Sequence, residues 1–232
     1  MVAAQVSYSV PFRIRFNRVI LRFGFRLLFH LLATVRITGK ENIPREGGYL
    51  IAVNHVSYSD PPFVIAFWPV APEAVGAVDI WSKPGQGQLA SWYGGIPVHR
   101  GEIDRNLMDK MTSILLSGRP LVIAPEGTRS HKPGLQRGQP GIAYVTDIVN
   151  VPVIPVGIVG TTDDFLNKAL HFQRPVLELR IGKPIQLPHI IGKGEERREA
   201  RQQNVDRIMT AIAELLPPEY RGVYGSKPST AG

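Results

Sequence analysis

The sequence predicts an α/β fold: a mixed, largely parallel sheet flanked by helices. After residue 40, apolar strand-like runs alternate with segments of helical periodicity, a pattern typical of βαβ units. The chain has 232 residues, which is enough for one domain with a substantial core. Its composition, 44% hydrophobic and 20% charged, is close to that of globular proteins. We therefore expect a single folded domain over residues 35–220.

Charge and cysteine content exclude several classes of function. The formal net charge is +8, but residues 1–40 contain seven basic side chains and no acidic one, so the rest of the chain is nearly neutral. A basic face across the fold, as in nucleic-acid-binding proteins, is not expected, and nucleic acid is not a predicted partner. Because the chain has no cysteine, a thiolate nucleophile, a cysteine-bound zinc ion and an iron–sulfur cluster are excluded.

Residues 1–34 are predicted to form a basic, amphipathic, membrane-associating segment. Four arginines recur at the spacing of one helical face, with large apolar residues at most other positions (Arg15, Arg18, Arg22 and Arg26). Arg22 and Arg26 interrupt the apolar run, so neither a membrane-spanning helix nor a signal peptide is expected. We expect a helix in the interface of a membrane, peripheral or monotopic at the cytoplasmic face, with arginines toward anionic head groups. The alternative is a helix packed on the core with a solvated basic stripe.

The body of the chain contains six predicted strands and two clear helices. The strands are expected at residues 49–53, 74–80, 96–98, 121–124, 153–159 and 176–181. Residues 104–117 and 195–216 have helical periodicity, and they end at Gly118 and at Pro217-Pro218. Residues 221–232 are expected to form a loose tail.

Polar side chains follow three of these strands, where the chemistry of parallel sheets gathers. They are Asn54-His55, His99-Arg100 and the stretch from Pro125 to Arg129. Both histidines belong to an HxxxxD pair, His55 with Asp60 and His99 with Asp104.

His55 and Asp60 are the predicted catalytic pair. Five residues turn a helix by about 140°, so the two side chains meet only if His55 lies in a turn and Asp60 begins a helix. Pro61-Pro62 supports this placement, since proline favours the first helical turn. A carboxylate on one imidazole nitrogen makes the other nitrogen a general base. The alternative for His55 is a hydrogen-bonded histidine in a turn. In the second HxxxxD pair, Asp104 is explained as the N-cap of a helix.

A site for an anionic substrate is predicted beside this pair. Gly127 allows a close backbone approach, Thr128 offers a hydroxyl, and Arg129 offers a planar fork that matches phosphate. Arg100 follows the predicted strand at residues 96–98, and Gly94-Gly95 comes just before that strand. The alternative for each arginine is a surface ion pair.

Four blocks of the sequence resemble a known family. Residues 54–60 (NHVSYSD), 95–100 (GIPVHR), 125–130 (PEGTRS) and 151–156 (VPVIPV) are similar, in order and spacing, to the four motifs of glycerolipid acyltransferases. The closest resemblance is to the 1-acyl-glycerol-3-phosphate acyltransferases, and it covers residues 35–185.

The resemblance implies transfer of a fatty acyl group from acyl-CoA or acyl carrier protein to lysophosphatidic acid, giving phosphatidic acid, with no metal ion and no cofactor. His55 would take the proton of the acceptor hydroxyl, and Asp60 would orient His55. The phosphate and glycerol site would contain Arg100, Glu126, Gly127, Thr128 and Arg129. Residues 151–156 would line the acyl-donor side.

Three departures from the family pattern leave the acceptor open. His99 stands where an aspartate is common, Ala124 where an aromatic residue is common, and residues 77–79 lack a common lysine, the nearest being Lys83. The alternatives are an acyltransferase for another lysophospholipid or for glycerol-3-phosphate, and a non-catalytic lipid-binding protein. A serine hydrolase is not expected because no GxSxG occurs.

Overall fold

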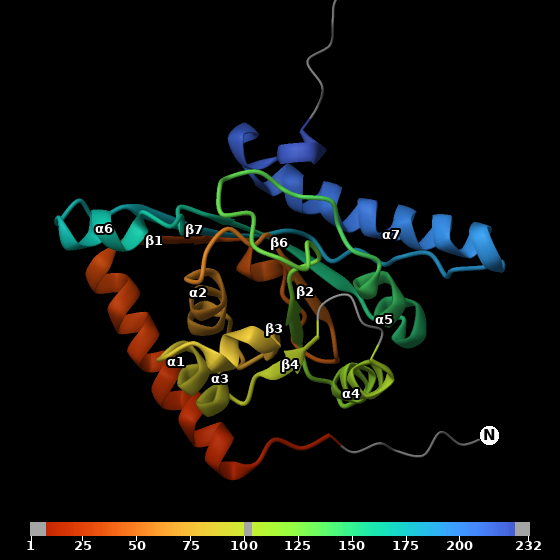
Figure 1. Cartoon of the computed structure of the whole chain (residues 1–232), viewed down its shortest axis with the longest axis horizontal. Helices are drawn as coiled ribbons and strands as arrows, with labels where there is room; N and C mark the ends of the chain where they lie inside the picture. Colours follow the sequence, from red (N-terminus) through yellow and green to blue (C-terminus); the bar gives the residue numbers. More distant parts are fainter. Residues whose placement is uncertain (1–7, 100–103, 226–232) are drawn as a thin grey trace, which may run out of the picture.

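The computed structural model describes residues 8–99 and 104–225. Its centre is a seven-stranded sheet with the order β1-β7-β6-β2-β5-β3-β4. Neighbouring strands are parallel except β6 and β7, which are antiparallel. The predicted mixed, largely parallel sheet is confirmed (Figure 1).

The strands and helices alternate along most of the chain. The strands are β1 (Thr34–Thr38), β2 (Leu50–Val53), β3 (Glu73–Ala77), β4 (Ile96–Val98), β5 (Leu121–Ile123), β6 (Val153–Val159) and β7 (Val176–Ile181). The α-helices are α1 (Phe12–Leu32), α2 (Asp60–Phe67), α3 (Gln86–Tyr93), α4 (Arg105–Leu116), α5 (Gly141–Val149), α6 (Phe165–Leu170) and α7 (Gly194–Leu215).

Helices cover both faces of the sheet and create two cores. One core contains apolar side chains of α4, α5 and α7, and the other contains those of α1, α2 and α6. Consecutive residues of β2 alternate between the two cores: Leu50 and Ala52 lie in the first, Ile51 and Val53 in the second. Both faces of this central strand are buried, which explains why its sequence is a continuous apolar run.

The helix predicted near the N-terminus is present as α1, but the predicted direction of its arginine face is wrong. Arg18, Arg22 and Arg26 face the protein: Arg18 is only 2% exposed and bonds to Glu73 at the start of β3. The Nε atom of Arg22 donates to the carbonyl of Ile65 at 3.0 Å, and that of Arg26 donates to the carbonyl of Ala66 at 2.5 Å. The last carbonyl groups of a helix have no intrahelical partner. The end of α2 therefore attracts the arginines.

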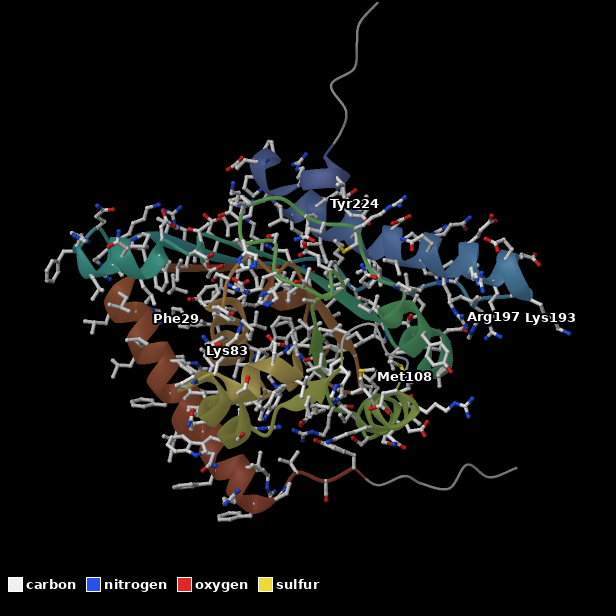
Figure 2. The ribbon with its side chains drawn as sticks, viewed as in Figure 1. Phe29, Lys83, Met108, Lys193, Arg197 and Tyr224 are labelled. Carbon is white, nitrogen blue, oxygen red and sulfur yellow. The ribbon has the colours of Figure 1, made fainter. Side chains whose placement is uncertain are left out.

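The opposite side of α1 is apolar and exposed. We call it the outer face of α1, and it consists of Phe12, Phe16, Val19, Ile20, Phe23, Leu27, Leu28 and Leu31. Phe29, labelled in Figure 2, lies on the inner side and packs in the second core. The helix is thus amphipathic in the reverse sense to an ordinary surface helix, whose apolar stripe faces the core.

Three further expectations need correction. Strand β1 was not predicted; it is an edge strand whose side chains alternate between partly buried and exposed. The predicted strand over residues 74–80 ends at Ala77, and a 3₁₀ helix follows at Val78–Ser82. The start of the predicted tail is packed, since Tyr224, labelled in Figure 2, donates to Asp206 at 3.0 Å and accepts from the backbone amide of Gly138 at 3.2 Å. Residues 226–232 lie outside the described part.

Candidate active site

His55 and Asp60 are in direct contact at the carboxyl end of β2. His55 lies in the turn after the strand, and Asp60 is the first residue of α2, followed by Pro61-Pro62. The Nδ1 atom of His55 is 2.8 Å from Oδ2 of Asp60. The same oxygen accepts hydrogen bonds from the backbone amides of Val56 and Ser57, at 2.7 and 2.8 Å. This geometry matches the arrangement that the spacing and the two prolines predicted.

The second carboxylate oxygen of Asp60 is held by a residue that the sequence did not indicate. The hydroxyl of Thr161 donates to Oδ1 of Asp60, and both side chains are buried. Thr161 follows the carboxyl end of β6, next to β2 in the sheet. The sequence signal for Thr161 was a polar side chain just after a predicted strand, which is the criterion that selected His55. The carboxylate, with all four donors in place, has one fixed orientation behind the histidine.

Glu126 supports His55 from the other side. Its Oε1 atom accepts from the backbone amide of His55 at 2.9 Å, and its Oε2 atom accepts from that of Gln136 at 2.8 Å. Burial raises the pKa of this carboxyl, and the two backbone hydrogen bonds oppose that rise. Glu126 is 2% exposed and is absent from the lining of the adjacent cavity. The structure thus gives Glu126 contacts with the loop backbone, and its contact with the acceptor stays a prediction.

A cavity of about 360 Å³ is lined in part by His55, and we call it the His55 cavity. Since Nδ1 of His55 is bonded to Asp60, Nε2 is the ring nitrogen that remains for a ligand. One part of the lining is polar and basic, with Lys83, Thr128 and Arg129 near His55. The other part is apolar and comes from α1, α2, α3 and the adjoining residues (Leu21, Phe25, Pro61, Pro62, Ile65, Ile80, Trp81, Leu89 and Ala90). The cavity fits a ligand with a charged end and a hydrocarbon end.

Tyr58 brings two cations together at the basic end. The guanidinium carbon of Arg129 lies 3.5 Å from the centroid of the Tyr58 ring, and Nζ of Lys83 lies 4.8 Å from it. Lys83 also bonds to the hydroxyl of Tyr58 at 2.5 Å, and this bond raises the pKa of the lysine. Stacking on an aromatic face orients the guanidinium of Arg129. Its Nη1 atom also lies 3.7 Å from Oδ1 of Asp163, which is the ion pair expected as the alternative for this arginine. Neither Tyr58 nor Lys83 was a predicted site residue, because the contact of one ring with two cations is visible only in three dimensions.

The remaining predicted site residues have different positions. Gly127 has a left-handed backbone with φ of +70°, which glycine adopts without strain. Arg100 lies outside the described residues. His99 is exposed, and Asp104 accepts from the backbone amides of Asn106 and Leu107 at 2.9 and 3.3 Å, so its interpretation as an N-cap is confirmed.

The fourth block belongs to the core. Val153, Ile154 and Val156 are fully buried in β6, and no residue of 151–156 lines the His55 cavity. These residues are therefore not part of this cavity, and their place on the acyl-donor side stays a prediction. The central position of β6, between β7 and β2, is the physical reason why they lie in the core.

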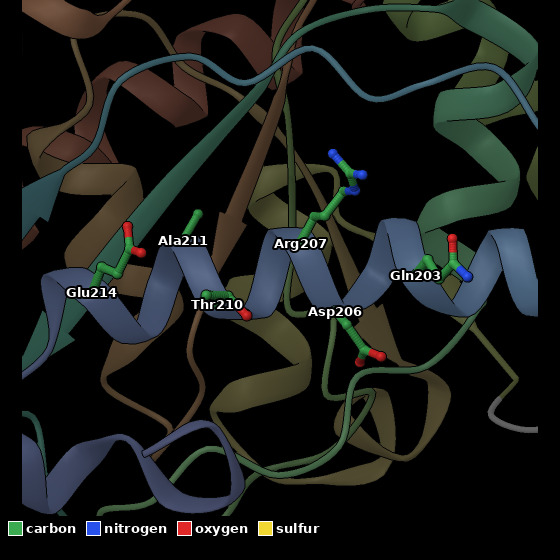
Figure 3. Close-up of a pocket in the computed structure, with 6 residues that line it drawn as sticks. All are labelled: Gln203, Asp206, Arg207, Thr210, Ala211 and Glu214. Carbon is green, nitrogen blue, oxygen red and sulfur yellow. The ribbon is translucent and has the colours of Figure 1, made fainter. Parts of the chain in front are cut away.

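A second hollow lies along α7 and shares no residue with the His55 cavity. It has a volume of about 560 Å³, and it is lined by one face of that helix (Gln203, Asp206, Arg207, Thr210, Ala211 and Glu214), as Figure 3 shows. It contains neither a histidine nor a nucleophile next to a base. The chemistry of the described residues therefore points to the His55 cavity.

A histidine backed by a buried carboxylate and facing an amphipathic cavity is an arrangement suited to general-base catalysis. Comparison with known proteins agrees. The family model described as Acyltransferase matches residues 34–159, more than half of the chain. This chain belongs to the acyltransferase family and is an acyltransferase.

A solved structure has a similar fold. It is the crystal structure of the 1-acyl-sn-glycerophosphate (LPA) acyltransferase PlsC from Thermotoga maritima. The TM-score is 0.59 and the sequence identity 22%, and the match covers 84% of this chain and 78% of that chain. At this identity, the match shows the fold.

Proposed function

We propose that this enzyme transfers a fatty acyl group from an acyl thioester to the free hydroxyl of 1-acyl-glycerol-3-phosphate, giving phosphatidic acid. One observation carries the proposal: His55, paired with Asp60, lines a cavity together with both cationic and apolar side chains. A lysophosphatidic acid has a phosphate for the first part and an acyl chain for the second. The similar protein from Thermotoga maritima is a 1-acyl-sn-glycerophosphate acyltransferase, which supports the same substrate class.

The reaction needs one proton to move twice. Nε2 of His55 takes the proton of the acceptor hydroxyl while its oxygen attacks the thioester carbonyl carbon. The tetrahedral intermediate then collapses, the carbon–sulfur bond breaks, and the departing sulfur takes the proton from His55. Asp60 holds the imidazole in the required tautomer and stabilises the transient imidazolium. No metal ion or cofactor takes part in this scheme.

Arg129 is proposed to bind the phosphate of the acceptor, so Arg129→Lys should lower turnover roughly 10–100-fold with lysophosphatidic acid. An ammonium group cannot reproduce a bidentate fork. The measurement is initial rates over a panel of acceptors with a radiolabelled acyl donor. The loss should shrink for a monoacylglycerol, which has no phosphate.

Arg207→Lys, on the exposed face of α7, is the matched control and should behave like the parent. If Arg129→Lys lowers turnover equally with both acceptors, Arg129 only supports Tyr58 and does not bind the phosphate. The parent enzyme on the same panel decides between lysophosphatidic acid, other lysophospholipids and glycerol-3-phosphate. Acyl-CoA and acyl carrier protein are compared as donors in parallel.

The enzyme is further proposed to work at a membrane surface, as a peripheral or monotopic protein. Among the described residues, no helix has the length and apolarity needed to span a bilayer. The outer face of α1 is a long apolar surface, and such surfaces are typical of interaction sites. Leu21 and Phe25 of the same helix line the His55 cavity. A lipid acceptor could thus pass from the interface to His55 along α1.

Substituting the outer face of α1 should release the protein from membranes. We expect Phe16→Ser, Phe23→Ser and Leu27→Ser together to abolish co-sedimentation with liposomes, because each apolar side chain contributes up to about 1.5–3 kcal/mol when buried. Activity on a detergent-dispersed acceptor should persist. Leu116→Ser, which changes an exposed leucine at the end of α4, is the control. Unchanged sedimentation of the triple variant would contradict the membrane proposal.

Because Arg18, Arg22 and Arg26 face the protein, the binding of the parent protein to liposomes should depend only weakly on salt concentration.

A further inference from the structure

A second exposed apolar surface lies beside the C-terminal end of α1. It consists of Leu166, Leu170 and Phe172, at α6 and the turn that follows, and we call it the α6 tip. These side chains are 53%, 73% and 93% exposed. Phe165 and Ala169, on the other side of the same short helix, are buried in the second core. Helix α6 thus has apolar side chains on both its buried and its exposed side.

The α6 tip is held firmly against α1. The guanidinium of Arg174 donates to the carbonyl oxygens of His30 and Ala33, at 3.1 and 3.4 Å. Phe165 stacks on Phe29 with ring centroids 6.1 Å apart. Figure 1 shows α6 at the end of α1, at one extreme of the molecule. The outer face of α1 and the α6 tip are therefore neighbouring parts of one rigid body.

The fold does not require a phenylalanine at position 172. Its backbone is left-handed, with φ of +58°, a conformation that is strained for bulky residues and suits glycine or asparagine. Its side chain is almost fully exposed, so folding gains no apolar burial in return. A strained position that folding does not reward is a reason to look for a function.

We propose that the α6 tip is a second membrane contact, which enters the same bilayer interface as the outer face of α1. The inference rests on the proposed membrane association. A bilayer is favoured over a protein partner because the α6 tip lies next to the C-terminal end of α1, and Leu21 and Phe25 of α1 line the cavity that is proposed to take a lipid acceptor. Two contacts fix the tilt of the molecule and hence the direction in which the His55 cavity meets the lipid.

The absence of native cysteine allows a direct test. Single variants Phe172→Cys, Leu27→Cys and Ile191→Cys are labelled with an environment-sensitive nitrobenzoxadiazole probe. Vesicles of phosphatidylcholine and phosphatidylglycerol are then added. Ile191 is the matched control: it is 81% exposed, and it lies two residues before Lys193, which Figure 2 labels at the opposite end of the molecule from α6. We expect a blue shift and a rise in fluorescence at positions 172 and 27, and neither at 191.

The outcomes separate this inference from the proposed function. If the probe at 172 stays aqueous while that at 27 enters the bilayer, the second contact is refuted and membrane association stands. If both stay aqueous, membrane association fails and the inference fails with it. A blue shift at 172 that grows with protein concentration, without vesicles, would assign the α6 tip to a second copy of the chain and overturn the proposal.

Phe172→Gly separates a membrane role from a structural one. Glycine relieves the left-handed strain and removes the apolar side chain, so this variant should be at least as heat-stable as the parent. Its partition onto vesicles should nevertheless fall about tenfold. A loss of thermal stability without a change in partition would mean that Phe172 is structural, and would overturn the proposal.

Discussion

Replacing His55 by alanine should lower the rate of acyl transfer by roughly 10²–10⁴-fold, the usual contribution of a general base. The side chain meets Asp60 through Nδ1 and faces the cavity with the rest of the ring. It is not part of either apolar core. The variant should therefore fold, and circular dichroism with steady-state kinetics on the same sample gives the measurement. Asp60→Asn should reproduce most of the loss, because the amide cannot stabilise an imidazolium as a carboxylate does.

The matched control is His99→Ala, which removes the histidine of the other HxxxxD pair. His99 is exposed and Asp104 is occupied as a helix cap, so activity should be retained. A folded His55→Ala protein with full activity would refute the mechanism. Loss of activity only in His99→Ala would transfer the base to the second pair.

The contact between His55 and Asp60 was predictable because its determinants are local. Five residues separate the two side chains, and Pro61-Pro62 fixes where the helix begins. Thr161 completes the pair from about a hundred positions further along the chain, through the adjacency of β2 and β6. Rules based on residue spacing do not apply to residues this far apart in the sequence. The order of strands in the sheet determines this contact, and periodicity alone does not determine that order.

The same distinction explains the error at α1 and the unexpected contacts of Glu126. The three- and four-residue spacing correctly indicated that the arginines share one face of a helix, but not whether that face meets water or protein. Glu73 and the carbonyl groups at the end of α2 decide this, and they lie 40 to 55 residues away. The motif around Glu126 likewise indicated a functional loop. Only the backbone amides of His55 and Gln136 reveal that the carboxylate supports the loop.

Arg18→Ala should destabilise the protein by about 3–5 kcal/mol, because it leaves the buried carboxylate of Glu73 without its main partner. Two guanidinium nitrogens of Arg18 bond to the two oxygens of Glu73 at 2.7 and 2.6 Å, and Nε donates to the carbonyl of Tyr93 at 2.8 Å. Glu73 is fully buried, and Arg119 and Tyr8 are its other partners. Urea unfolding of the variant gives the free energy. Arg15→Ala, at an exposed arginine of the same helix, should stay within about 0.5 kcal/mol of the parent.

The pH dependence of unfolding distinguishes a lost ion pair from lost packing. Burial alone would raise the pKa of Glu73, but the hydrogen bonds and charge of Arg18, together with Tyr8 and Arg119, outweigh it and lower the pKa. A carboxyl whose pKa is lower in the folded state contributes stability above its unfolded pKa, and this stability is lost as the pH falls through the folded pKa. In Arg18→Ala, the effect of burial is opposed by fewer partners, so the pKa of Glu73 rises in the folded state. The variant should therefore lose less stability than the parent on acidification. If the two stability curves run parallel between neutral and acid pH, Arg18 holds α1 by packing alone, and the buried ion pair is not what fixes the helix to the body.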